Sequence, residues 1–199
     1  MIPSLTLSFK NMLAVGLLAI GAFFADPERE TKIWVFPGSE VIISGTSNIN
    51  KFNCSYLVQG IEVPIHLVYR EDLDEIHFKN AGLKLPSDCF DCGGKAINRD
   101  FKEILRTERY PEIKLRLLYV DPPSRETNKV GVGMEITLAG VTRRYTTQLE
   151  SWTQGDIFVK GTLDLKLTDF GLEPPKKVLG LIKVDDQVKV NLNLRLKEI

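Results

Sequence analysis

The segment VKVNLNLRLK, residues 188–197, decides the fold of this chain. Apolar side chains alternate with polar ones along it without a break. Successive side chains of a β-strand point to opposite faces of the sheet, so this period of two predicts a strand with one apolar face. Burial of one face is typical of antiparallel sheets, because parallel strands buried on both faces form continuous apolar runs.

The same alternation recurs along most of the chain. In the segment 113–119 the apolar face is expected to extend from Ile113 to Tyr119. Further segments of this kind lie at 41–46, 61–70, 76–79, 130–138, 141–150, 156–160 and 163–168. Gly and Pro residues separate them, as expected for strands that are joined by turns. We therefore predict an all-β fold in which about eight antiparallel strands close into a barrel with an apolar interior.

One helix is expected among the strands. Asn98 is a suitable N-cap residue, and Asp100 would lie in the first turn, where the helix dipole favours an acid. The apolar residues Ile97, Phe101, Ile104 and Leu105 fall on one side of this helix, which should end before Tyr110-Pro111. A single amphipathic helix in a β-barrel is expected to lie over an open end, with its apolar side toward the interior.

The charge balance argues against a nucleic-acid partner. The chain has 26 Lys and Arg residues and 26 Asp and Glu residues. Nucleic acids attract proteins with a basic excess, which this composition lacks.

Residues 1–25 have the composition of a signal peptide. An apolar run of 14 residues, Met12 to Ala25, precedes the polar segment 26–30. A membrane-spanning helix needs ~20 apolar residues, whereas the apolar region of a signal peptide is shorter. We expect cleavage after Ala25, export from the cytoplasm, and one domain over residues 26–199 without a membrane span. A retained, uncleaved anchor is the alternative.

Three cysteines, Cys54, Cys89 and Cys92, predict one disulfide and one thiol in an oxidising compartment. The C-x-x-C spacing of Cys89 and Cys92 also fits a redox dithiol or half of a metal site, which would have to recruit Cys54 and His66 or His77. The simpler interpretation is that one of the pair bridges to Cys54. The chain has no nucleophile motif such as G-x-S-x-G, and we expect no catalytic residue, metal or cofactor.

Several motifs resemble one known family. They are NRDF at 98–101, YPEIKL at 110–115, ITLAGVTRR at 136–144, LTDFGL at 167–172 and the closing strand at 188–196. Their combination and order resemble the YceI-like family. The resemblance implies an eight-stranded, lipocalin-like barrel that is exported to the bacterial periplasm and holds a long apolar lipid such as a polyisoprenoid.

Two segments resemble a cysteine-bearing branch of that family. They are 45–54, which ends at Cys54, and 90–93, which contains Cys92. The resemblance implies a disulfide between Cys54 and Cys92 and leaves Cys89 outside the motif.

These observations favour a carrier that removes a long apolar lipid from water, rather than an enzyme. Two alternatives stay open: a structural or interaction barrel whose core is fully packed, and a thiol redox protein that uses Cys89 and Cys92. The residues expected to line the lipid site lie on the apolar side of a strand or of the helix, and core packing is the alternative for each of them. They are Ile65, Phe78, Phe101, Val132, Met134, Ile136, Leu163, Leu165, Val190, Leu192 and Leu194.

Overall fold

The computed structural model describes residues 27–58, 64–122, 127–177 and 181–199. The signal peptide expected at 1–25 lies outside the described residues. Its strands are β1 (Arg29–Val35), β2 (Glu40–Ser47), β3 (Lys51–Leu57), β4 (Ile65–Glu71), β5 (Ile76–Phe78), β6 (Gly82–Pro86), β7 (Glu112–Val120), β8 (Lys129–Leu138), β9 (Val141–Gln154), β10 (Asp156–Lys166), β11 (Lys176–Lys177) and β12 (Ile182–Glu198). Its helices are η1 (Ser87–Cys89), α1 (Lys95–Leu105) and η2 (Leu167–Phe170).

The strands form the closed antiparallel barrel that the alternation predicts. A ring of eight strands runs β1-β4-β5-β7-β8-β9-β10-β12 and returns to β1. β12 pairs with β10 along one edge, and with β2 and then β1 along the other. β1 and β2 are therefore two parts of one barrel strand, interrupted at residues 36–39, where Pro37 cannot donate a backbone hydrogen bond. β5 and β6 likewise pair with successive parts of one edge of β7.

One part of the barrel wall is closed without strand pairing. The described residues contain no pairing between β3 and β6. The segment 87–92 follows β6, and its Asp91 exchanges backbone hydrogen bonds with Ser55 of β3. The Cys54–Cys92 disulfide, which the resemblance implies, fastens this segment to β3.

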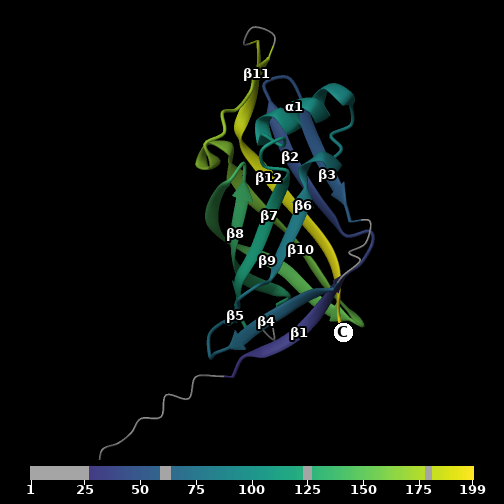
Figure 1. The fold of residues 1–199 in the computed structure, drawn as a ribbon, viewed down its shortest axis with the longest axis vertical. Coiled ribbons are helices and arrows are strands. Elements are labelled where there is room, and N and C mark those ends of the chain that lie inside the picture. Colours follow the sequence, from purple (N-terminus) through teal and green to yellow (C-terminus); the bar gives the residue numbers. More distant parts are fainter. Residues whose placement is uncertain (1–26, 59–63, 123–126, 178–180) are drawn as a thin grey trace, which may run out of the picture.

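Helix α1 lies at one end of the elongated barrel, opposite the end formed by β1, β4 and β5 (Figure 1). The position near an open end is as predicted, and the side chains of Phe101 and Leu105 are buried there. The ring of Phe101 lies 5.3 Å from that of Phe90, which in turn lies 5.3 Å from that of Tyr56 on β3. In the described part of the chain, no helix has the length and apolar character that a membrane span requires.

The expected start of this helix is wrong. It begins at Lys95 with Gly94 as the N-cap, so Asn98 lies inside the helix and Asp100 lies beyond its first turn. The Oδ1 atom of Asn98 accepts the backbone N–H of Cys92 at 2.7 Å, and its Nδ2 donates to Asp91. Asn98 therefore caps the chain before the helix, because Gly93, with a φ of +87°, turns that backbone toward it.

The prediction that Tyr119 continues the apolar inward face of β7 is also wrong. A bulge between Leu117 and Tyr119 adds one residue, so Tyr119 pairs with Gly133 of β8. The Tyr119 ring lies where a side chain at position 133 would be, and its hydroxyl is 3.3 Å from the Thr146 hydroxyl. Tyr119 is therefore on the outer face of the barrel.

The disulfide is expected to contribute much of the stability of the fold. Its cysteines are 38 positions apart, and replacing both with Ala should lower the free energy of unfolding by about 4 kcal/mol, because the unfolded chain loses its cross-link. Urea unfolding of the Cys54→Ala/Cys92→Ala variant measures this loss. Cys89→Ala, which removes an exposed thiol, is the control. Equal losses in the two variants would contradict the prediction.

Candidate functional site

A large cavity occupies the end of the barrel formed by β1, β4 and β5. Its volume is about 470 Å³. The apolar side chains that line it include Ile33, Val35, Ile65, Leu67, Phe78, Leu117, Met134, Leu149, Leu192, Leu194 and Leu196. Several of them, such as Leu67, Phe78 and Leu117, point inward and are nevertheless only half-buried. The cavity is therefore apolar and accessible from solvent.

A small cavity of about 60 Å³ lies under helix α1 at the other end of the barrel. Phe101, Ile104 and Leu105 of the helix cover it, and Phe52 and Phe90 lie at its side. Every residue that lines this small cavity is apolar. Its volume is large enough for a water molecule, but the lining provides no side-chain partner for one.

A packed layer of side chains divides the two cavities. Leu115 lines both of them, and consecutive inward residues on β8, Met134 and Ile136, line the large and the small cavity respectively. Leu163 is 5% exposed and lines neither. Next to this layer, Leu149 fills the space that a side chain at Gly161 would occupy. The interior is therefore one apolar column that the side chains interrupt near its middle.

The predicted lining residues are divided between the two cavities. Those in the large cavity are Ile65, Phe78, Met134, Leu192 and Leu194. Those in the small cavity are Phe101, Ile136, Leu165 and Val190. Val132 and Leu163 line neither cavity, because the core is packed around both. Contact of any of these residues with a ligand stays a prediction.

The sequence interpretation missed β1, which contributes Thr31, Ile33 and Val35 to the large cavity. These residues alternate with Lys32 and Trp34, so a period of two was present. It was obscured because the strand is short and begins with charged residues. Glu71 and Glu198, which also line the cavity, were missed because they lie where their strands end.

The cysteines do not form a Cys89–Cys92 dithiol, because Cys92 is bonded to Cys54. Cys89 is an exposed free thiol. Partial desolvation and the neighbouring Asp88 carboxylate raise the pKa of Cys89, which favours the protonated thiol over the nucleophilic thiolate. In the described residues, no group of three or more His, Cys, Asp or Glu side chains is placed to hold a metal ion.

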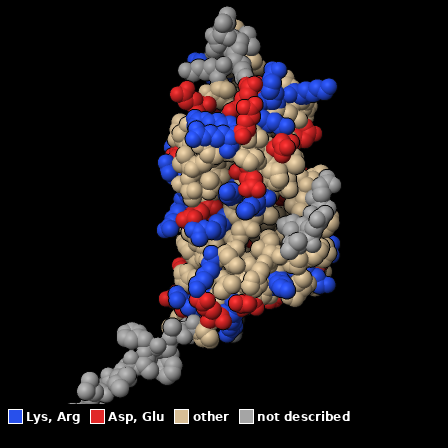
Figure 2. Space-filling model, in the orientation of Figure 1, with Lys and Arg blue, Asp and Glu red and all other residues tan. Residues whose placement is uncertain are grey.

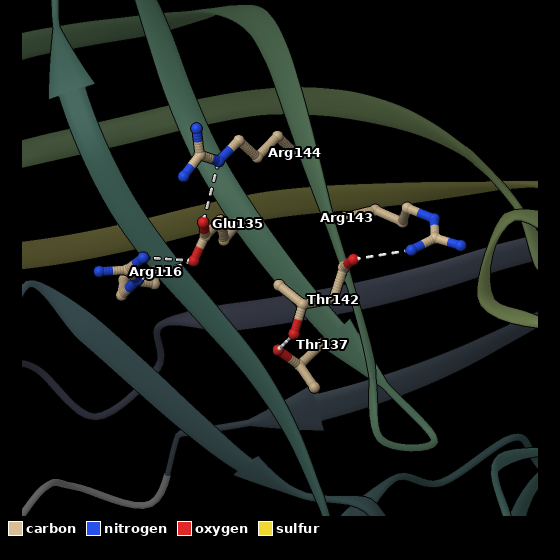
Figure 3. A network of polar contacts seen from close by, with 6 residues as sticks. All are labelled: Arg116, Glu135, Thr137, Thr142, Arg143 and Arg144. Atoms are coloured by element: carbon tan, nitrogen blue, oxygen red, sulfur yellow. Dashed lines mark hydrogen bonds and ion pairs between the residues drawn. The ribbon is translucent and has the colours of Figure 1, made fainter.

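The face of the molecule seen in Figure 2 carries basic and acidic side chains interspersed among uncharged ones. Glu135 of β8 makes ion pairs with Arg116 of β7 and Arg144 of β9 (Figure 3). The Nε atom of Arg144 is 3.0 Å from Oε1 of Glu135, whose side chain is only 15% exposed. Hydrogen bonds from both arginines hold the pKa of Glu135 below its ordinary value. The cluster joins three neighbouring strands on the face opposite the cavity.

A closed barrel of eight antiparallel strands around an accessible apolar cavity defines a lipocalin-like β-barrel protein. The sequence pattern of the YceI-like domain matches residues 62–196. The chain belongs to the YceI-like family, as the motifs at 98–172 predict.

Two solved structures support the same fold. One is a polyisoprenoid binding domain from Saccharophagus degradans that is implicated in plant cell wall breakdown. It is 16% identical, with a TM-score of 0.56, and the match covers 83% of this chain and 97% of that one. The other is BcnA from Burkholderia cenocepacia, also 16% identical, with a TM-score of 0.51 and coverage of 78% and 95%. None of the curated proteins compared with the chain matches it.

The Glu135 cluster predicts a pH dependence of stability. A carboxylate whose folded pKa is lowered stabilises the fold above its unfolded pKa, and this stabilisation is lost as the pH falls through the folded pKa. Glu135→Gln should therefore lower the urea midpoint at about pH 7 and have less effect at about pH 3. Glu150→Gln, at an exposed position of β9, is the control for loss of one charge. A difference between Glu135→Gln and the unmodified protein that stays constant with pH would contradict this account.

Proposed function

We propose that the protein binds one long apolar lipid of the isoprenoid type in the large cavity, and carries or sequesters it without chemical change. The accessible apolar cavity of about 470 Å³ is the observation on which this proposal rests. Ligand pockets commonly have volumes of about 300–1,000 Å³. The similar domain from Saccharophagus degradans is a polyisoprenoid binding domain, which supports the same ligand class.

The energetics of the cavity suit a hydrocarbon. Burial of hydrocarbon contributes about 0.8 kcal/mol per CH₂ group, so a chain that enters this cavity needs little polar recognition to bind tightly. The ligand would also cover the half-buried inward side chains of β4 and β5. In a fully packed structural barrel these side chains would instead be covered by protein.

The site contains the features of binding rather than those of a reaction. Its lining is almost entirely apolar, and among its polar side chains Thr31 is hydrogen bonded to Glu198 and Glu71 is paired with Arg29. We therefore assign the cavity to lipid binding, with transfer or storage of the lipid as the biological role.

We also propose that the protein is exported to the periplasm and matures by loss of residues 1–25. The apolar run from Met12 to Ala25 and the Cys54–Cys92 disulfide support this location, since disulfides persist in oxidising compartments.

Lipid retention should depend on the inward face of β12. Leu192 lines the large cavity, and Asn193 points to the outer face. Leu192→Asp should abolish the lipid that copurifies with the protein, because a carboxylate in the cavity would lose its solvation, whereas Asn193→Asp should leave it unchanged. Mass spectrometry of organic extracts from purified protein measures retention.

A second pair of variants tests the cavity without adding a charge. Leu67→Trp fills the large cavity from β4, and His66→Trp adds the same ring on the exposed face of the same strand. Only Leu67→Trp should reduce retention. Lipid retained equally by both variants, or absent from the unmodified protein, would favour the packed structural barrel.

Export is tested by N-terminal sequencing of protein from the fractionated native host. The expected mature N-terminus is near Asp26, in the fraction outside the cytoplasm. Intact Met1 on protein from the cytosolic fraction would refute export.

A further inference from the structure

The large cavity has a polar rim on one side of its mouth. Along β4, the inward residues are apolar or aromatic from Ile65 to Tyr69 and end at Glu71. The inward residues of β12 are likewise apolar up to Leu196 and end at Glu198. On β1, Thr31 lies nearer the mouth of the cavity than Ile33. These strands meet at the end of the barrel opposite α1 (Figure 1). We call Thr31, Glu71 and Glu198 the acidic rim.

Each carboxylate of the acidic rim has a polar partner. The Thr31 hydroxyl donates to Oε1 of Glu198 at 2.7 Å. The Nη1 atom of Arg29 lies 2.8 Å from Oε2 of Glu71. Arg29 offsets the charge of Glu71, so the rim together with Arg29 keeps a net negative charge from Glu198. Arg116 is the basic residue in the cavity lining, and its guanidinium is paired with Glu135 on the outer face.

The inner end of the large cavity offers no such groups. Leu115, Met134, Leu149 and Leu192 surround it, and the packed layer closes it. Burying a polar head group there without a hydrogen-bond partner would be costly. A lipid in this cavity therefore places its tail against the packed layer and its polar end at the acidic rim.

We infer that the acidic rim selects lipids whose polar end is an uncharged hydrogen-bond donor, such as an isoprenoid alcohol, and rejects those that end in phosphate. An ionised carboxylate only accepts hydrogen bonds, so it can pair with a hydroxyl group. A phosphate brings negative charge and acceptor oxygens to a rim that already has both. This inference rests on the proposed lipid-binding function and adds the class of head group.

Two probes with the same tail and different head groups test the inference. Geranylgeraniol and geranylgeranyl phosphate are titrated into delipidated protein at low ionic strength, with isothermal titration calorimetry as the measurement. The alcohol should bind about tenfold more tightly than the phosphate, because charge repulsion at a partly solvated rim acts on the phosphate alone.

Variants of the rim show whether its carboxylates cause the preference. Glu71→Gln/Glu198→Gln should improve phosphate binding and bring the two affinities close together, and Glu198→Gln alone should give part of this change. The control is Glu30→Gln/Glu150→Gln, which removes two charges from the outer face and should leave the ratio unchanged.

The outcomes separate this inference from the proposed function. Phosphate binding as tight as alcohol binding, or a preference that the rim variants do not alter, overturns the acidic-rim inference and leaves lipid binding in place. Failure of both probes to bind overturns the inference together with the proposed function.

Discussion

β12 closes the barrel because it is hydrogen bonded along both edges over most of its length. One edge pairs with β10 from Gln187 to Leu196, and the other pairs with β2 and then with β1. This double pairing fixes which side chains of β12 face inward. Since β1 and β10 are the neighbours of β12 in the ring, their inward faces are fixed with it. The contribution of these three strands to the cavity lining therefore follows from the pairing of β12.

The alternation of side chains was sufficient to predict the antiparallel barrel and most of its inward faces. Val190, Leu192 and Leu194 face inward as expected, since a period of two leaves no other choice once one face is buried. Features that depend on one residue were not predictable in this way. The bulge before Tyr119 reverses the face of that residue, and Asn98 caps the preceding chain rather than its own helix.

The separation of the interior into two cavities could not be predicted from the sequence either. Met134 and Ile136 lie on the same strand and on the same face of it, yet they line different cavities. Their difference depends on where the interior is filled, which is set by side chains from distant strands such as the buried Leu163. The acidic rim was overlooked for a related reason. A charged residue at the end of an apolar alternation looks like the end of a strand, and only the closed ring shows that Glu71 and Glu198 face the same opening.

The position of β12 in the chain has a consequence for how the protein is made. Its pairing with β1 joins positions such as Ile33 and Glu198, which are as far apart in sequence as almost any two described residues. Contacts of such long range form slowly, since the intervening chain must lose its freedom before they are gained. During synthesis β1 can therefore complete its pairing only after β12 has been made. Until the ring closes, the chain has no enclosed cavity.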